Sequence, residues 1–385
     1  MSTKVLIKET DRNYITCILE NDEWKEILAE PRNKSILHNI YVGKVTSVSV
    51  NIEAAFVSIG NENCYLPFKE CAGRIPKVGE ELLVQVVKES IKTKDAMVSC
   101  NLSISGQYFA LTTGNRKIGV SAKITDSSKR KELTVLVNEV LKEEYSFGVV
   151  VRTNAANEKA EDLKPELENL CTKLHSVCSA GKMRTCYSLL YKSPASYLER
   201  IRDIRQSELD RIVTDSREVY EELKHVYPTE LYQDNMLSLD KLYRFESNIA
   251  EALKKKVWLK SGGYLIIEPT EALTVIDVNS GKFTGKKTSK ETYRMINRDA
   301  AKEIARQLRL RNLSGIIIVD FINMKEKENG EELIQYLSAL VKGDKIRTNV
   351  LGLTSLGLME ITRMKVRKPV RQQLWEAGYE ISEYS

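Results

Sequence analysis

The sequence has 385 residues, of which 42% are hydrophobic and 29% charged, and its formal net charge is +6. This length and composition predict roughly two to four folded domains rather than a disordered chain. No apolar run approaches the roughly 20 residues that span a bilayer, and the N-terminus lacks the apolar core of a signal peptide, so we expect a cytoplasmic protein. A net charge of +6 is too small for a chain of this length to indicate nucleic-acid binding by itself.

The cysteines predict no metal centre. Seven are scattered along the chain, and no two form a Cys-x-x-Cys pair. Zinc sites need closely spaced ligand pairs, so we interpret these residues as reduced thiols. Cys171, His175 and Cys178 have helical spacing, but no fourth ligand accompanies them.

The first 100 residues are rich in predicted strands. Residues 1–36 predict a strand pair followed by a short helix, and five short β runs follow between residues 39 and 103. Such closely spaced strands indicate a small barrel of the OB type. Phe56 and Tyr65 fall on adjacent runs, and Lys94 lies in the same barrel. Aromatic rings in such barrels stack bases while lysines follow phosphates, but the same two rings can simply fill the core.

A second α/β module is predicted from residue 103 to residue 190. At its centre, the β run Gly148–Val151 leads into Arg152 and Thr153, and a helix begins near Glu158. A guanidinium and a hydroxyl group before a helix N-terminus can bind a phosphate together. The alternative is that Arg152 forms an ordinary surface ion pair.

The rest of the chain divides near residue 258. Residues 191–257 are highly charged and predict amphipathic helices without a chemical role. A final unit is then predicted to contain a hairpin, a helix from about 289 to 311, a strand at 315–319, a helix at 330–342 and a strand at 350–352. A basic segment follows it.

The long helix of this final unit has two contrasting faces. Basic side chains recur every four residues on one face, and apolar side chains recur every four residues on another. The basic ones are Arg294, Arg298, Lys302 and Arg306, and the apolar ones are Ile296, Ala300, Ile304 and Leu308. The basic face either is simply solvated or binds a phosphate backbone, with Arg294 and Arg298 as the candidate contacts.

Two aspartates end neighbouring apolar runs of the final unit. Asp277 follows residues 273–276, and Asp320 follows residues 316–319. The carboxyl ends of such strands are where open α/β sheets bind ligands, and paired carboxylates suit Mg²⁺. Asn279 would point to the same side as Asp277. The alternative for Asp277 is a turn or helix-capping residue.

The small number of histidines restricts the chemistry that is possible at the carboxyl ends of these two strands. The chain has three, none near the aspartates, so histidine acid–base cleavage of RNA is not expected. Metal-assisted hydrolysis of a phosphodiester is the alternative, and it would leave a 5′-phosphate and a 3′-hydroxyl.

Several segments resemble the ribonuclease E/G family. IDVNSGKFTG, ARQLRLRNLSGIIIVDFINM and LGLTSLGLMEITR are similar to its catalytic domain, EAAFVSIG and YLPFKE to its S1 RNA-binding domain, and VVVRTNA to its sensor for a 5′-monophosphate. The resemblance covers nearly the whole chain in the same order. It implies an Mg²⁺-dependent endoribonuclease of RNA processing and decay that cuts single-stranded, A/U-rich sites in mRNA or rRNA precursors.

The resemblance also implies a role for individual residues. Asp277 and Asp320 would hold the metal, and Asn279 would position the scissile phosphate or a water molecule. The residues implied to hold a 5′-phosphate are Arg152, Thr153 and the backbone of Gly119. Those implied to bind the RNA strand are Phe56, Tyr65 and Lys94.

The implied fold is a multidomain α/β protein with a small β-barrel. An RNase H-like subdomain, residues 1–36 and 197–257, would be interrupted by an S1 (OB-fold) domain at 37–102 and a 5′-sensor domain at 103–196. A DNase I-like catalytic domain would occupy 258–370, and a C-terminal tail 371–385.

Two departures from the family pattern affect these expectations. Asn323 stands where the family has a second acidic residue, and the family's Cys-Pro-x-Cys element, through which two chains share zinc, does not follow residue 363. We therefore expect a ribonuclease G-like form without bound zinc, whose homo-oligomer, if one forms, lacks a zinc link. The alternative function is that of a non-catalytic RNA-binding relative.

Overall fold

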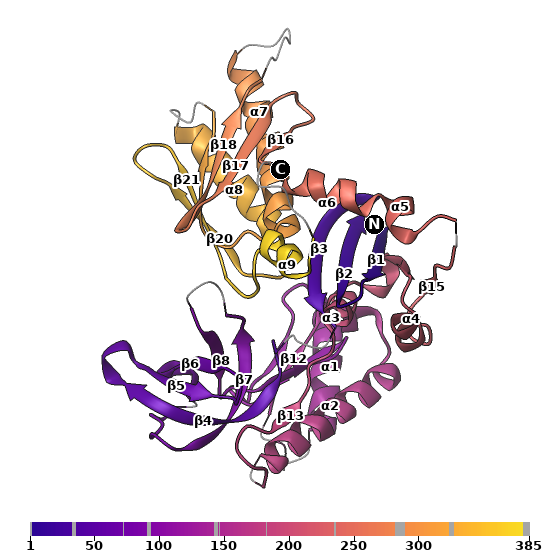
Figure 1. The fold of residues 1–385 in the computed structure, drawn as a ribbon, viewed down its shortest axis with the longest axis vertical. Helices are drawn as coiled ribbons and strands as arrows, with labels where there is room; N and C mark the ends of the chain where they lie inside the picture. Colours follow the sequence, from indigo (N-terminus) through magenta and orange to yellow (C-terminus); the bar gives the residue numbers. More distant parts are fainter. Residues whose placement is uncertain are drawn as a thin grey trace. The chain divides into compact units, whose positions relative to one another are not determined.

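The computed structural model describes residues 2–32, 36–71, 73–90, 94–141, 145, 147–181, 183–234, 236–281, 289–322 and 327–379, without the side chains of 289, 290 and 327–329. The protein is a mixed α/β chain with a small five-stranded β-barrel (Figure 1). It forms two compact units, one of residues 1–33 and 209–385 and the other of residues 34–208. In the described part of the chain, no helix is long and apolar enough to cross a membrane.

The first unit begins with a five-stranded sheet in the order β15-β14-β1-β2-β3. Its strands are β1 (Thr3–Glu9), β2 (Asn13–Glu20), β3 (Glu23–Pro31), β14 (Leu209–Thr214) and β15 (Thr229–Leu231). The helices of this part are α4 (Arg217–Leu223), α5 (Leu239–Tyr243) and α6 (Phe245–Leu253). Because β1 pairs with β14 in parallel, the N-terminus and the segment after residue 208 share one sheet.

Two expectations for this sheet are wrong. The segment predicted as a short helix after the first strand pair is strand β3, which pairs antiparallel with β2. Residues 191–257, predicted as helices, also contain β14 and β15. In both places tertiary pairing outweighs local helix propensity, since Ile27 of β3 and Val213 of β14 are buried in one core with Phe245.

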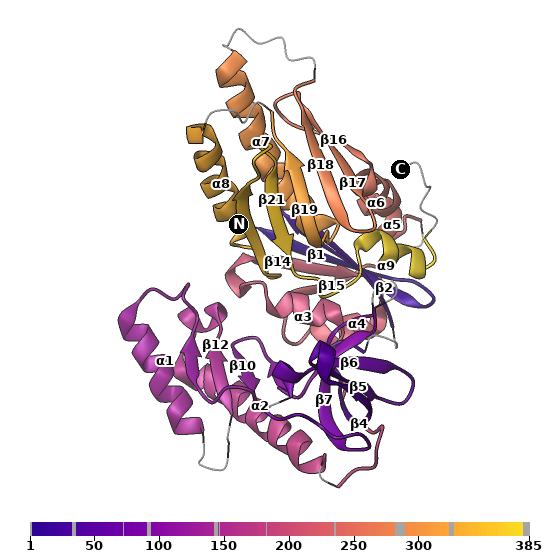
Figure 2. The same ribbon diagram turned by 90° about the vertical axis from the view of Figure 1, so that its left-hand side faces the viewer.

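The second sheet of this unit has six strands in the order β16-β17-β18-β19-β21-β20. The strands are β16 (Lys256–Trp258), β17 (Tyr264–Pro269), β18 (Leu273–Asn279), β19 (Gly315–Asp320), β20 (Thr348–Leu353) and β21 (Met359–Arg363). Helices α7 (Ser289–Leu310) and α8 (Lys327–Val341) lie side by side over one face (Figure 2). The predicted hairpin, both helices and both later strands are confirmed.

The apolar side of α7 explains why it packs on the sheet. Ile296, Ala300, Ile304 and Leu308 are all fully buried, in one cluster with Ile276 and Ile317 of the strands beneath. The periodicity predicted from the sequence is therefore confirmed for this side. A last helix, α9 (Val370–Glu376), begins at the last residue of the predicted catalytic domain and continues into the predicted tail, and its Leu374 is fully buried in the core around Phe245.

The second unit contains the barrel. Strands β4 (Ile40–Ser49), β5 (Ala54–Ser58), β6 (Asn63–Pro67), β7 (Glu81–Lys88) and β8 (Ala96–Ser99) coincide with the five predicted runs. They close into a ring because β4 pairs with both β5 and β7. At Gly43 of β4 a Cβ atom would lie 2.5 Å from Val57, so only glycine fits this close approach. Strand β13 (Leu189–Tyr191) extends the sheet from β4.

A four-stranded sheet in the order β11-β12-β10-β9 completes the second unit. Its strands are β9 (Ser103–Ser105), β10 (Phe109–Thr112), β11 (Ile118–Val120) and β12 (Gly148–Val151), and its helices are α1 (Ser127–Val140), α2 (Ala160–Ala180) and α3 (Ser196–Arg202). Short 3₁₀ helices of the unit are η1 (Val50–Ile52), η2 (Phe68–Glu70), η3 (Thr153–Asn157) and η4 (Gln206–Glu208). The assignment of the sheets to the named domains of the family stays a prediction.

Candidate active site

The two predicted aspartates lie directly opposite each other in the six-stranded sheet. Strands β18 and β19 run parallel, and Asp277 is the register partner of Asp320 at their carboxyl ends. Both side chains are exposed, whereas the neighbouring Ile276, Val278 and Val319 are buried beneath the helices. The alternation of a β-strand therefore aims both carboxylates to the sheet face that the helices leave free.

Asn279 completes this group. It lies two residues beyond Asp277 on the same face, and its Nδ2 donates a hydrogen bond of 2.7 Å to Oδ2 of Asp277. Asp277 is inside a strand that pairs on both sides, so the interpretation of this residue as a turn or capping residue is wrong. Asn323, the altered acidic position, lies outside the described residues.

The donor set at this edge suits a hard divalent cation. Asp277 and Asp320 supply carboxylate oxygens, and Asn279 supplies an amide oxygen, which are the ligand types that Mg²⁺ prefers. Neither aspartate forms an ion pair within the described residues, which also contain no cluster of three or more His, Cys, Asp or Glu side chains suited to a metal. Mg²⁺ commonly takes only one or two carboxylates and completes its shell with water and phosphate, so two carboxylates fit it.

The basic face of α7 is divided by its ion pairs. Arg294 and Arg298 bind the carboxylate of Glu332 on α8, at 2.6 and 2.8 Å, and Arg298 also lies 4.2 Å from the ring centre of Tyr336. Arg306 is instead largely buried and donates to Glu303. Arg306 is therefore not part of the exposed basic face that the sequence predicted. Glu332 could not be identified from the sequence, because its contacts with the arginines join side chains of two different helices.

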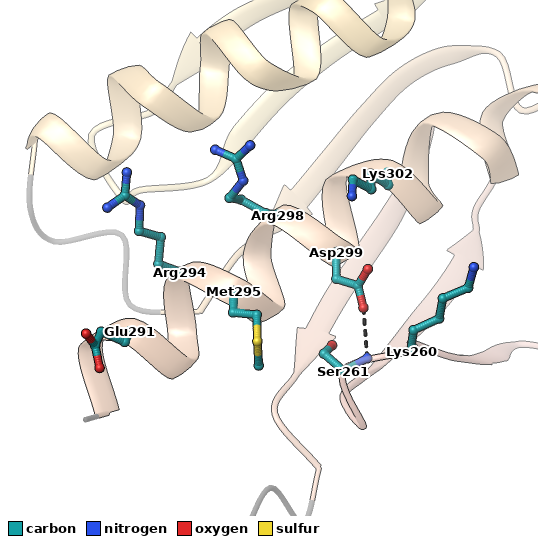
Figure 3. Close-up of a pocket in the computed structure, with 8 residues that line it drawn as sticks. All are labelled: Lys260, Ser261, Glu291, Arg294, Met295, Arg298, Asp299 and Lys302. Carbon is teal, nitrogen blue, oxygen red and sulfur yellow. Dashed lines mark hydrogen bonds between the residues drawn. The ribbon is translucent and has the colours of Figure 1, made fainter. Parts of the chain in front are cut away.

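A recess of about 540 Å³ lies beside this face of α7. Four of its lining residues are basic, and the other four are Ser261, Glu291, Met295 and Asp299; the basic ones are Lys260, Arg294, Arg298 and Lys302 (Figure 3). Asp299 accepts a hydrogen bond of 2.8 Å from the backbone nitrogen of Ser261, which ties the turn before β17 to α7. Gly263 at the end of this turn packs closely on the backbone of Asn279, since a Cβ atom there would lie 2.7 Å from the carbonyl oxygen of Asn279. The recess thus presents an excess of positive charge close to this turn.

The barrel aromatics form a cross-strand pair. Phe56 and Tyr65 are register partners, and their ring centres are 6.1 Å apart with the planes at 70°. Both are half-buried, whereas Val57 and Leu66 beside them are fully buried and fill the barrel core. Lys94, just before β8, is exposed. The rings therefore have area available to a ligand, but part of each is used in packing.

The three residues predicted to bind a 5′-phosphate share one corner of the four-stranded sheet. Gly119 on β11 is the register partner of Val150, and Arg152 and Thr153 follow β12 directly. Thr153 shares a hydrogen bond of 2.9 Å with Ser121. The guanidinium of Arg152 donates to the carbonyl of Gly106 at 2.6 Å and forms an ion pair with Asp203. The alternative expected for Arg152, an ion pair, is thus present.

Comparisons with known proteins identify the same family that the sequence segments resemble. The model of the ribonuclease E/G family matches residues 103–366. Ribonuclease G of Salmonella typhimurium is 32% identical over 404 residues, which cover 97% of this chain and 82% of that protein. Ribonuclease G of Haemophilus influenzae is 33% identical with the same coverage. Ribonuclease E of a Nostoc species is 33% identical over 95% of this chain and 56% of that protein. The chain therefore belongs to the ribonuclease E/G family.

Proposed function

We propose that this chain is a metal-dependent endoribonuclease that hydrolyses single-stranded, A/U-rich RNA in RNA processing and decay. The observation that carries the proposal is the register pairing of Asp277 with Asp320 at an exposed strand edge. Two carboxylates held side by side repel each other, so folding alone does not favour the arrangement. Membership of the ribonuclease E/G family, whose relatives are named ribonuclease G and ribonuclease E, supports a ribonuclease.

The proposed chemistry divides between the three residues of the edge. Asp277 and Asp320 would hold Mg²⁺, which when bound supplies a charge that orients water and polarises a phosphate. Asn279 is held in place by its hydrogen bond to Asp277, so its amide is ready to position the scissile phosphate or the attacking water. Hydrolysis of this kind leaves a 5′-phosphate and a 3′-hydroxyl.

Most of the RNA would be bound by surfaces other than the site formed by Asp277, Asn279 and Asp320. We assign the RNA strand to the half-buried pair Phe56 and Tyr65 with Lys94, because partly exposed rings can stack bases. Arg294 and Arg298 would contact the phosphate backbone.

The 5′ end of the substrate would be bound separately. Arg152 and Thr153, with the backbone of Gly119, would favour a 5′-monophosphate over a 5′-hydroxyl. In that case the phosphate would compete with Asp203 for the guanidinium of Arg152.

The decisive experiment uses a 5′-monophosphorylated, A/U-rich single strand with and without Mg²⁺. We expect endonucleolytic cuts only with Mg²⁺, and a loss of at least about 100-fold in cleavage rate in Asp277→Asn with RNA affinity retained. Asp210→Asn is the matched control, because Asp210 is an exposed aspartate on β14 of the other sheet. Binding without any Mg²⁺-dependent cut would favour a non-catalytic RNA-binding relative and refute the enzyme.

A further inference from the structure

An aromatic pair with a lysine above it lies on the same face of the six-stranded sheet as the aspartates. Trp258 on β16 and Tyr264 on β17 are register partners, with ring centres 5.3 Å apart and planes at 63°. Nζ of Lys256 lies 4.0 Å from the ring centre of Trp258 and 3.9 Å from that of Tyr264. The three side chains therefore form one compact group, which we call the aromatic platform.

The core beneath the sheet does not require this platform. The opposite face is filled by the cluster around Leu265, Ile276 and Ile304, to which neither ring belongs. Trp258 is 63% exposed. A tryptophan that served only to pack would be mostly buried, because burial is what its large apolar area contributes. Lys256 above the rings can also protect an edge strand from pairing, but that role needs no tryptophan.

The platform has a fixed position relative to the proposed catalytic edge. Tyr264 is the register partner of Asn279, and Ile266 is that of Asp277. Trp258, Tyr264 and Asn279 thus stand in one row across three neighbouring strands, and side chains directly opposite each other share a face. Strands are about 4.8 Å apart, so Trp258 lies roughly 10 Å across the sheet from Asn279. That separation suits a nucleotide near the reacting phosphate rather than the reacting phosphate itself.

We propose that Trp258, Tyr264 and Lys256 form a subsite that stacks one unpaired base of the RNA beside the cleavage position. Lys256 covers one face of each ring, but the exposed part of Trp258 still offers a π surface to any base, and the ammonium group adds attraction for the adjoining phosphate. A base in a duplex is already stacked on its neighbours, so the subsite selects single-stranded RNA. The inference rests on the proposed ribonuclease function for its location, but its binding can be measured without cleavage.

The first test compares tryptophan variants in RNA binding without Mg²⁺. Trp258→Ala should weaken binding of a fluorescent A/U-rich single strand about tenfold, the effect of losing one stacked base, while Trp258→Phe should restore most of it. Trp375→Ala is the matched control, because Trp375 is 71% exposed but lies on α9 outside the platform. In cleavage, Trp258→Ala should raise KM with little change in kcat. Equal affinity of wild type and Trp258→Ala would overturn the proposal.

The second test locates the stacked base. In a series of strands with a single abasic nucleotide at successive positions along the strand, wild type should lose affinity about tenfold at one position. Trp258→Ala should show no further loss at that position. If both proteins lose the same affinity at every abasic position, the subsite is absent. The comparison uses the loss at each position relative to the intact strand in the same protein, so a general loss of affinity in Trp258→Ala does not affect it. If the position-specific loss is found but no RNA is cut with Mg²⁺, the ribonuclease function fails while the subsite stands.

Discussion

Two settings for aspartate within the first unit differ sharply. Asp344, before β20, accepts a hydrogen bond of 2.7 Å from Nε of Arg363 at the end of β21, and their side chains are only 6% and 3% exposed. Arg363 also donates to Oδ1 of Asn312 and to the carbonyl of Leu313. Asp277 and Asp320, by contrast, are exposed and have each other as neighbours.

The difference separates a residue needed for folding from residues available for chemistry. At Asp344 the cost of burying a charge is offset within the folded chain, since the carboxylate is paired with and hydrogen-bonded to Arg363. Asp277 and Asp320 carry like charges that repel each other, and both side chains are in contact with water. A bound cation would neutralise this negative charge, and for this reason we propose that the catalytic site lies at the carboxyl ends of these two strands.

The largest expected effect is on stability at the buried pair. Asp344→Asn leaves the charge of Arg363 buried without an acidic partner, so the free energy of unfolding should fall by about 3–5 kcal/mol in urea denaturation. Asp277→Asn is the matched change at the exposed edge, and it should alter that free energy by no more than about 0.5 kcal/mol. Similar losses in the two variants would refute the distinction between the two settings.

Acid should weaken the same buried pair. Burial alone would raise the pKa of Asp344, but the hydrogen bond and charge of Arg363 outweigh it and hold the pKa below its ordinary value of 3.8. The stabilisation is therefore fully present above this value and is lost as pH falls through the lower pKa of the folded state. The difference in unfolding free energy between wild type and Asp344→Asn should be constant from pH 7 to about 5 and shrink below about 4. A difference that grew with acid would contradict the direction of the shift.

A smaller effect is expected at the strand-end arginine of the second unit. If Arg152 binds the 5′-phosphate, Arg152→Ala should reduce the preference for 5′-monophosphorylated over 5′-hydroxyl RNA by about tenfold, the contribution of a hydrogen bond to a charged group. The measurement is kcat/KM on the two forms of one strand, with Arg184→Ala, an exposed arginine of the same unit, as the control. If wild type has no preference, or if Arg152→Ala keeps it, Arg152 is only the partner of Asp203.

Local patterns predicted much of this architecture. The period of four in α7 identified its buried side chains, and the apolar runs ending in Asp277 and Asp320 identified two strands and the edge where they meet. Partners that lie far apart in the sequence or across elements leave no such period. Strand β3, the pairing of β1 with β14, Glu332 beside the α7 arginines and the ring of Trp258 against Tyr264 all depend on contacts of this kind. The interruption of one sheet by a whole unit could be expected only from the family resemblance.

The smallest predicted effect concerns Glu332, which combines features of both settings because it is only half-buried and yet paired. The hydrogen bond from Arg294 holds the pKa of Glu332 below its ordinary value, so at pH 7 its charge offsets part of the positive charge of Arg294 and Arg298. Glu332→Gln should therefore tighten RNA binding a few-fold and steepen the slope of log Kd against log salt by up to about 1, if the arginines contact phosphates.

Glu331→Gln is the matched control for this change, because Glu331 is exposed on the same helix and has no ion pair within the described residues. Weaker binding in Glu332→Gln would mean that the carboxylate positions the arginines rather than competing with RNA for them. No change in either variant would mean that the arginines hold α7 to α8, as Asp344 and Arg363 hold their part of the core, and that RNA is bound elsewhere.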